Sequence, residues 1–345
     1  MADDFEADGT WLTLSTGAAI PAAVGPRPED FRVDEVDAYP ASGEGEHLLV
    51  RIEKRGLSTP EAVHRIAVAT GLRDSEIGYA GRKDARALST QRLSLPRRVE
   101  PLLARAEEGA LRILDTAAHN RKLRMGHLAG NRFAINLSPI AAEQQQTVRA
   151  RAQEIADGYL PNYFGHQRLG RGASNALAGL RLLAAGRSGR GRRNSDFLIS
   201  AAQSLLFNDL VALRIRRDLF LRAVDGDLLK TRRGGLFTCT DAAADSDRIQ
   251  RREVTITGPM YGRKMMTPSG TALTLESEIL ARRQMEAASF LSFKPPIPGT
   301  RRQIQVAVED LTIEFSETAT EIKFLLPAGS YATILVRELM RVTTE

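Results

Sequence analysis

The chain has 345 residues, of which 43% are hydrophobic and 26% are charged, a composition typical of a globular protein with one large domain or two. No apolar run approaches the roughly 18 residues of a membrane-spanning helix, so we expect no membrane partner. The formal net charge of +6 favours a polyanionic partner such as nucleic acid. Arginine supplies most of the positive charge, however, and biased codon usage can produce that excess without a functional demand.

Cysteine and histidine content argues against a metal centre. Cys239 is the single cysteine, so the chain can form neither an internal disulfide nor a cysteine-based zinc site. The five histidines are scattered and show no metal-ligand spacing.

The acidic start of the chain lacks the basic and apolar segments of a secretory signal. We therefore expect a cytoplasmic protein without a metal.

The first third of the chain alternates strands with one clear helix. Apolar residues at every second position predict strands over 29–36 and 46–54. Thr59 as N-cap, a proline at the first helical position and Gly71 at the end predict a helix between them. A short strand and a glycine turn follow in "EIGYAG", residues 76–81.

The middle of the chain is richer in helices, whereas its end returns to strands. Strands are predicted at 92–96 and, as two, within 111–140, followed by a helix over 141–158. The helical segments of the middle are 175–186, 196–222 and one near 274–288, and a basic linker, "GRSGRGRRN", occupies 186–194. Residues 302–315 predict a hairpin-like pair of strands, and Ser330 is the predicted cap of a helix over 331–341.

This order predicts an α+β protein. The economical architecture is a mixed-sheet domain built from both ends of the chain, with a second domain inserted between them. Two sequential domains are the alternative that the pattern leaves open.

The segment "GYAGRKDARA", residues 78–87, is the first candidate site. A free aspartate carboxyl is ionised at neutral pH, so Asp84 could attack an electrophilic carbon without a base to activate it. Gly78 and Gly81 could let the backbone approach a bulky ligand. The alternative is a turn held by a surface ion pair, which contributes under about 1 kcal/mol.

Two further segments combine aromatic, polar and basic side chains. In "RKLRMGHLAGNRF", residues 121–133, Asn131 could bind a base edge and Phe133 could stack or pack in the core. Residues 161–170, "PNYFGHQRLG", also place aromatic rings among arginines, a pattern that suits RNA. The chain contains no P-loop and no strand-linked G-x-G-x-x-G, so nucleotide and methyl-donor chemistry have no support.

Taken together, eight segments in this order resemble the TruD-type tRNA pseudouridine synthases over nearly the whole chain. They are "RPEDFRVDEV", "GEGEHLLVRIEK", "GYAGRKDARA", "RKLRMGHLAGNRF", "LPNYFGHQRLG", "SAAQSLLFN", "VDGD" and "LPAGSYATILVREL". The resemblance implies an enzyme that isomerises uridine in tRNA to pseudouridine, at position 13 in the D arm. It also implies a catalytic pseudouridine-synthase domain with a mixed, largely antiparallel sheet, over 1–158 and 306–345, and an inserted α+β TRUD domain over 159–305.

The resemblance also implies the roles of particular residues. The family's nucleophile corresponds to Asp84, and Lys83 would be its charge partner. The substrate-binding positions correspond to Phe31, Asn131, Phe133 and Tyr331. Tyr331 stands where the family often has phenylalanine, so stacking is retained and a hydroxyl is added.

The reaction that the resemblance implies needs no cofactor, because it changes no oxidation state. We expect tRNA as the partner, no nucleotide cofactor and a monomeric enzyme. The roles of Tyr79 and Arg27, and tRNA contacts by Arg190, Arg192 and Arg193, stay open. The rival hypotheses are a non-catalytic RNA-binding or tRNA-folding protein on the same fold, a nucleotide-dependent or methyl-transferring tRNA enzyme, and a basic structural protein.

Overall fold

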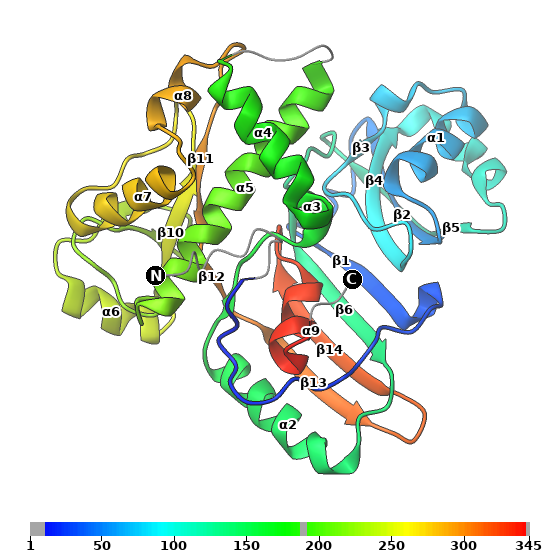
Figure 1. Cartoon of the computed structure of the whole chain (residues 1–345). Coiled ribbons are helices and arrows are strands. Elements are labelled where there is room, and N and C mark those ends of the chain that lie inside the picture. The colour runs from blue at the N-terminus through cyan, green and yellow to red at the C-terminus, as the bar shows by residue number, and fades with distance from the viewer. Residues whose placement is uncertain (1–10, 187–191, 343–345) are drawn as a thin grey trace. The chain divides into compact units, whose positions relative to one another are not determined.

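The structure, a computed structural model, describes residues 11–186 and 192–342 of the chain. Its internal contacts divide the chain into two compact units (Figure 1). Unit 2 comprises Ile20–Ala156 and Val308–Gly329, and unit 1 comprises the other described residues. The chain leaves unit 2 after Ala156 and returns to it at Val308, close to the predicted limits of the insert. It enters unit 1 again at Ser330.

Both ends of the described chain belong to unit 1. The ring of Trp11 stacks on that of Tyr163 with centroids 5.7 Å apart, and the N–H of Leu14 donates to Glu338 Oε2 at 2.8 Å. The predicted catalytic domain, in contrast, included both ends. A division by contacts does not say which residues catalyse, so the assignment of a catalytic domain and an insert stays a prediction.

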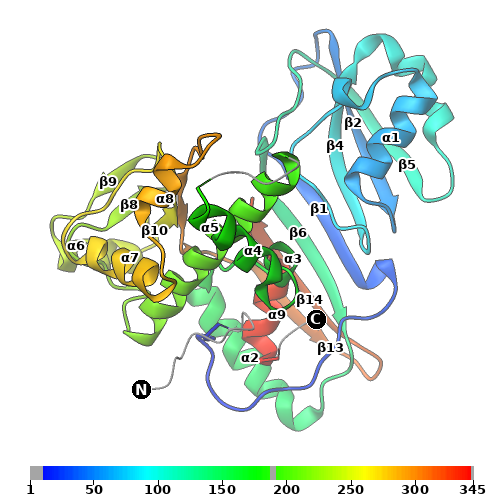
Figure 2. The ribbon, with the colours of Figure 1, turned by 45° about the horizontal axis from the view of Figure 1, so that its top comes forward.

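Unit 2 is built on one eight-stranded sheet (Figure 2). The hydrogen-bonded order is β13-β14-β6-β1-β4-β2-β5, and the short β3 pairs with β4. The strands are β1 (Phe31–Asp37), β2 (His47–Arg55), β3 (Gly78–Tyr79), β4 (Leu88–Pro96), β5 (Leu111–His119), β6 (Leu128–Leu137), β13 (Glu309–Phe315) and β14 (Thr320–Pro327). Only β1 and β4 pair in parallel, so the sheet is mixed and largely antiparallel, as predicted.

Alternating side chains explain the central strands. In β14, every second residue from Thr320 to Leu326 is buried, because successive side chains of a strand point to opposite faces. β6 runs close beside β14 at Gly130, where an added Cβ would lie 2.3 Å from the carbonyl oxygen of Leu326. The glycine is therefore required for this pairing.

Helix α1 (Thr59–Thr70) covers one side of this sheet, and its predicted cap is wrong by one residue (Figure 2). Ser58, rather than Thr59, is the N-cap: Glu61 Oε2 accepts the Ser58 N–H at 2.7 Å, and Ser58 Oγ accepts the Glu61 N–H. The helix ends as predicted at Gly71, whose φ is +72°. Its buried stripe packs on apolar residues of β2 and β4.

Unit 2 contains further helical elements. They are η1 (Pro28–Asp30), η2 (Asp74–Glu76), η3 (Arg97–Ala106) and α2 (Ala142–Asp157), whose last residue is counted in unit 1. In α2, the guanidinium carbon of Arg149 lies 4.8 Å from the ring centre of Phe315 in β13. This cation–π contact joins α2 to the edge strand of the sheet.

Unit 1 combines small sheets with most of the helices. One sheet has the order β11-β10-β8-β9, and β12 pairs with β7 in another. Its strands are β7 (Leu160–Pro161), β8 (Leu228–Thr231), β9 (Leu236–Thr238), β10 (Val254–Met260), β11 (Thr300–Gln303) and β12 (Gln305–Val306). Its helices are α3 (His166–Leu169), η4 (Arg171–Ala173), α4 (Ser174–Ala184), α5 (Arg192–Arg216), α6 (Ala242–Gln250), α7 (Gly270–Arg282), α8 (Ala287–Ser292) and α9 (Ala332–Met340).

Two predictions for the end of the chain are wrong. Residues 302–315 do not form a hairpin, because β11, β12 and β13 pair with β10, β7 and β14 respectively. Alternation identified strand-forming residues there but carries no information about their partners. The N-cap of helix α9 is Tyr331, not Ser330, and the Tyr331 side chain makes no capping hydrogen bond.

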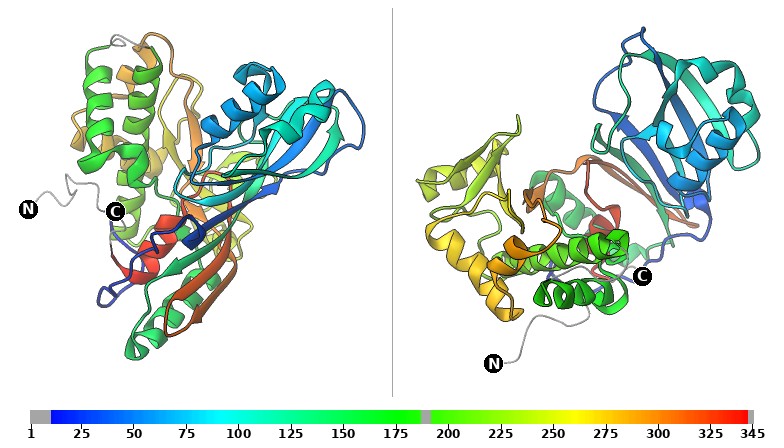
Figure 3. Two further views of the ribbon diagram at one scale, coloured as in Figure 1. Left: turned by 90° about the vertical axis from the view of Figure 1, so that its right-hand side faces the viewer. Right: turned by 90° about the horizontal axis from the view of Figure 1, so that it is seen from above.

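Helix α5 forms the core of unit 1 and lies beside α4 (Figure 3). Its segment Asn194–Arg216 contains a window with mean hydropathy 1.3, long and apolar enough to cross a membrane. However, 83% of that window is buried inside the protein, as in the core helix of a globular domain.

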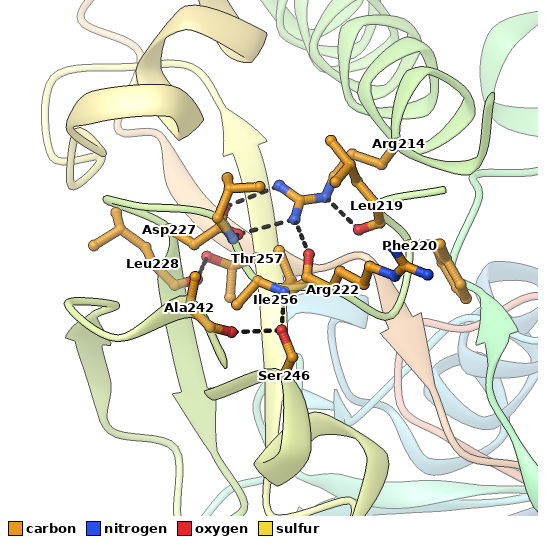
Figure 4. A network of polar contacts seen from close by, with 12 residues as sticks. Arg214, Leu219, Phe220, Arg222, Asp227, Leu228, Ala242, Ser246, Ile256 and Thr257 are labelled. Atoms are coloured by element: carbon orange, nitrogen blue, oxygen red, sulfur yellow. Dashed lines mark hydrogen bonds and ion pairs between the residues drawn. The ribbon is translucent and has the colours of Figure 1, made fainter. Parts of the chain in front are cut away.

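The C-terminal end of α5 is fixed by a buried ion pair (Figure 4). The Arg214 guanidinium donates to both carboxylate oxygens of Asp227 at 2.9 Å, and also to the carbonyl oxygens of Leu219 and Arg222. Asp227 comes from the "VDGD" segment, so this segment has a structural role in unit 1.

Candidate active site

Asp84 lies in the loop between β3 and β4, and its side chain is exposed. The N–H of Arg86 donates to Asp84 Oδ1 at 3.0 Å, so the loop turns tightly around the carboxylate. Gly78 serves packing within the protein, since an added Cβ would lie 2.4 Å from the carbonyl oxygen of Leu123. The carboxylate is thus accessible, and the backbone beside it is closely packed.

Two buried side chains hold the backbone of this loop. Lys54 of β2 donates from Nζ to the carbonyl oxygen of Asp84 at 2.9 Å, and the hydroxyl of Thr59 accepts the N–H of Lys83 at 2.9 Å. Neither residue was predicted to belong to the site. Lys54 stands in the charged run "EKR", which is typical of an exposed strand end, and Thr59 was interpreted as a helix cap.

Lys83, the predicted charge partner of Asp84, binds a different carboxylate. Its Nζ lies 2.5 Å from Oε2 of Glu35 in β1, and both side chains are nearly fully buried. Glu35 Oε1 in turn accepts the N–H of Arg92 at 3.1 Å. The pair attaches the Asp84 loop to the face of the sheet on which Glu35 lies.

Phe31 and Phe133, both predicted to bind substrate, lie in contact on that face. Phe31 opens β1 and is half-buried, and its ring meets that of Phe133 edge-on with centroids 6.2 Å apart. Phe133 of β6 is buried and stacks on Phe324 of β14 at 5.1 Å. Phe31 is therefore the ring that retains surface for a planar ligand, and Phe133 supports it from behind.

Asn131 lies opposite Glu35 where β6 pairs with β1. Residues directly opposite in an antiparallel pair share a face, and alternation puts Phe133 on that face too. The Asn131 Oδ1 atom is buried and accepts no hydrogen bond from the part of the chain that the structure describes. A buried acceptor without a partner costs free energy, so this atom is available to accept a hydrogen bond from a bound ligand or water.

Tyr331, the last predicted substrate contact, belongs to unit 1, whereas Phe31, Lys83, Asp84, Asn131 and Phe133 belong to unit 2. The Tyr331 ring meets Phe164 edge-on at 6.0 Å, and Gly165 makes room for it, since an added Cβ would lie 3.2 Å from the ring.

Arg302 completes the surroundings of Phe164. Its guanidinium carbon lies 4.0 Å from the ring centre of Phe164, and its Nη2 donates to Asn162 Oδ1 at 2.6 Å. Burial lowers the pKa of Arg302 to about 10. The "PNYFGHQRLG" segment therefore places Tyr331 within a packed cluster of unit 1.

Residues whose roles the sequence left open have structural contacts. The half-buried ring of Tyr79 packs against the hydrophobic core of unit 2. The exposed Arg27 pairs with Asp30 at 3.2 Å, which raises the Arg27 pKa. Arg190 and the side chains of Arg192 and Arg193 lie outside the described residues.

Exposed arginines lie in the Asp84 loop and in a neighbouring loop. Arg82 and Arg86 flank Asp84, and Arg121 and Arg124 lie in the next loop, whose Gly126 N–H donates to the carbonyl oxygen of Ala80 at 2.8 Å. Within residues 11–186 and 192–342, the guanidinium groups of these four arginines make no hydrogen bond or ion pair. They are available to bind phosphate groups. In the same ranges, no three or more His, Cys, Asp or Glu side chains are grouped to hold a metal ion.

Comparisons with known proteins agree on one family. The family model described as tRNA pseudouridine synthase D (TruD) matches residues 14–186 and 192–339. A relative in Anaeromyxobacter sp. (strain Fw109-5), named tRNA pseudouridine synthase D, is 43% identical over 326 residues, which cover 92% of each chain. A protein of that name in Thermus thermophilus is 39% identical over 320 residues, or 91% of this chain and 87% of the relative.

A solved structure confirms the fold class. The crystal structure of the putative tRNA pseudouridine synthase D (TruD) from Methanosarcina mazei superposes with a TM-score of 0.75 and covers 96% of both chains, at 22% identity. The mixed α+β architecture predicted from the sequence is therefore correct.

Proposed function

Because the chain belongs to the TruD family, we propose that it is a tRNA pseudouridine synthase that isomerises uridine, at position 13 of the D arm, with Asp84 as nucleophile. The observation that carries this proposal is the arrangement around the Asp84 loop. The Asp84 carboxylate is exposed, while hydrogen bonds fix the backbone of its loop. Lys83 joins this loop to the sheet face that bears Asn131 and the pair of Phe31 and Phe133.

The reaction exchanges one bond of the nucleoside for another. The C1′–N1 bond breaks and a C1′–C5 bond forms, while C5 loses a proton and N1 gains one, so substrate and product are isomers. A carboxylate is suited to this chemistry, because it can attack C1′, or take a related covalent path, without prior deprotonation. Asp84 would hold one fragment while the freed uracil turns.

Asn131 suits the recognition of uracil. Uracil presents an N–H donor at N3, where cytosine has an acceptor, so the buried Oδ1 of Asn131 would accept from uracil alone. A half-turn of uracil about the line through N3 and C6 exchanges N1 with C5 and leaves the N3–H direction unchanged. One acceptor could therefore hold the base before and after its rotation.

Aromatic and basic residues would complete the binding of the nucleotide. The target base must leave its stack, which costs a few kcal/mol, and stacking on Phe31 would offset part of that cost. Phe133 supports Phe31, whereas Tyr331 belongs to unit 1 and stays a predicted substrate contact. Arg82, Arg86, Arg121 and Arg124 would bind backbone phosphates around the target.

We further propose that the protein acts as a cytoplasmic monomer with tRNA as its partner and without a cofactor. The isomerisation changes no oxidation state and consumes no energy carrier, so it requires no redox or nucleotide cofactor.

Site-resolved mapping of pseudouridine tests the reaction and its position. Purified protein is incubated with an unmodified tRNA that carries U13 and, as the matched control, with the same tRNA carrying C13. We expect pseudouridine at position 13 of the first tRNA and none in the second. Pseudouridine at another position would contradict the proposed site, and its absence from every tRNA would favour an RNA-binding or tRNA-folding protein on this fold.

A further inference from the structure

Lys54 is a fully buried lysine with an unusual set of partners. It lies in β2 beneath the Asp84 loop, and its Nζ donates to two backbone carbonyl oxygens, those of Leu57 and Asp84. The bond to the Asp84 carbonyl is 2.9 Å long. Within residues 11–186 and 192–342, no carboxylate forms an ion pair with Lys54.

A buried ammonium without a paired carboxylate is costly to maintain. The pKa of Lys54 is lowered to about 8, mainly by burial and to a lesser extent by Lys83, while Asp84 and Glu61 oppose the shift. An apolar side chain of similar size would avoid this desolvation cost. Stability alone therefore does not account for a lysine at this position, whereas its bond to the Asp84 backbone suggests a role.

The bond from Lys54 completes a three-point attachment. The N–H of Lys83 binds the Thr59 hydroxyl, and the Lys83 ammonium binds Glu35. These two contacts fix the residue before Asp84, whereas Lys54 fixes Asp84 itself. The carboxylate, in contrast, remains exposed.

We propose that Lys54 is a positioning residue, whose ammonium holds the Asp84 backbone so that the carboxylate faces the target nucleotide. This inference rests on the proposed function of Asp84. A group that is misplaced by 1 Å can lose about 100-fold in rate, so a hydrogen bond that sets the place of a nucleophile has a large kinetic effect. Lys54 itself would not touch the tRNA.

The charge of Lys54 gives the proposal a pH signature. The charged groups that act on Lys54 are Asp84, Lys83 and Glu61. As pH rises through about 8, Lys54 loses its proton, and its bond to the Asp84 carbonyl loses the added strength that charge provides. The rate of the chemical step should therefore fall over this range. An arginine at position 54 would stay charged and remove the fall.

The test compares Lys54→Met and Lys54→Arg with Ile66→Val, a change in the core of α1 that does not touch the loop. Single-turnover rates on tRNA, tRNA affinity and amide hydrogen exchange over residues 83–87 are measured for each. We expect Lys54→Met to slow the reaction by about 10- to 100-fold, with affinity unchanged and faster exchange in the loop. Lys54→Arg should retain more activity than Lys54→Met and lose the decline near pH 8.

Two outcomes would overturn the positioning role. One is a rate for Lys54→Met that equals the wild-type rate or that of Ile66→Val. The other is a wild-type rate that does not fall between pH 7 and pH 9, which decides the question even if Lys54→Met does not fold. A wild-type protein that forms no pseudouridine would instead contradict the proposed function, and hydrogen exchange would still show whether Lys54 anchors the loop.

Discussion

The ammonium of Lys83 and the carboxylate of Glu35 lie 2.5 Å apart, with only 4% and 2% of their side chains exposed. This pair connects the loop that carries Asp84 to β1. The Lys83 ammonium thus binds Glu35 and not its sequence neighbour Asp84. Lys83 would therefore support the nucleophile through the backbone rather than as a neighbouring charge.

The buried pair makes stability depend on both partners. Glu35→Gln leaves the Lys83 ammonium buried without its carboxylate, and we expect the free energy of unfolding to fall by about 3–5 kcal/mol. Arg73→Gln is the control, because it breaks an exposed ion pair with Glu76 and should cost less than about 1 kcal/mol. Urea unfolding measures both, and equal effects of the two changes would show that the buried pair has no special importance.

Asn131 should matter for catalysis more than for stability. Its Oδ1 has no protein partner among the described residues, so Asn131→Ala removes no internal bond of that atom. Loss of the contact to uracil N3–H should cost about 1–3 kcal/mol of transition-state stabilisation. Asn136→Ala is the control on the same strand, since Asn136 points to the opposite face and contacts Asp30. Single-turnover kinetics would contradict the role of Asn131 if both variants react at the same rate.

The exposed arginines should determine how salt affects tRNA binding. Each arginine that contacts a phosphate adds about 0.7–0.9 to the magnitude of the slope of log affinity against log salt. We therefore expect this magnitude to fall by that amount when one such residue is changed to glutamine; the four candidates are Arg82, Arg86, Arg121 and Arg124. Arg98→Gln is the matched control, because Arg98 is also exposed but pairs with Glu76. Titrations at several salt concentrations measure the slope. An unchanged slope in all four variants would place the tRNA elsewhere.

Lys54 should also give stability a distinctive pH dependence. Its pKa is about 8 in the folded protein and 10.5 ordinarily, so between these values the unfolded chain binds the proton and the folded chain does not. Stability therefore gains from this group as pH rises through that window. The stability of the wild type relative to Lys54→Met should rise from pH 8 to pH 10.5, while the reaction rate falls. Urea unfolding at several pH values checks this, and a constant difference would mean that Lys54 does not titrate there.

Local patterns predicted the strands of the sheet and the position of α1 well. Alternation marked β1 and β2, because each has one face on a core, and Gly71 marked the end of α1. Partners were less predictable, since residues 302–315 alternate like a hairpin although their strands pair with three other segments. The alternation of apolar and polar residues reflects which face of a strand is buried, and it carries no information about the neighbouring strand.

The sequence identified the candidate site only where the resemblance assigned a role to a residue. Asp84, Asn131 and Phe133 are such residues. Lys54 and Glu35 also stand in recognised segments, but their roles could not be predicted, because whether a charged residue is buried depends on partners that distant segments supply. The contact of Lys54 with Asp84 and of Glu35 with Lys83 arises from the pairing of β1, β2 and β4.

The central claim is that Asp84 performs the chemistry, and Asp84→Asn tests it most directly. The variant keeps the size and the turn of the side chain but removes the nucleophilic charge. Pseudouridine formation on a U13-bearing tRNA is measured under single-turnover conditions for both proteins, together with tRNA affinity. The account predicts product with the wild type, none with Asp84→Asn, and the same affinity for both. Pseudouridine from Asp84→Asn at the wild-type rate, or a loss of activity that follows a loss of binding, would contradict it.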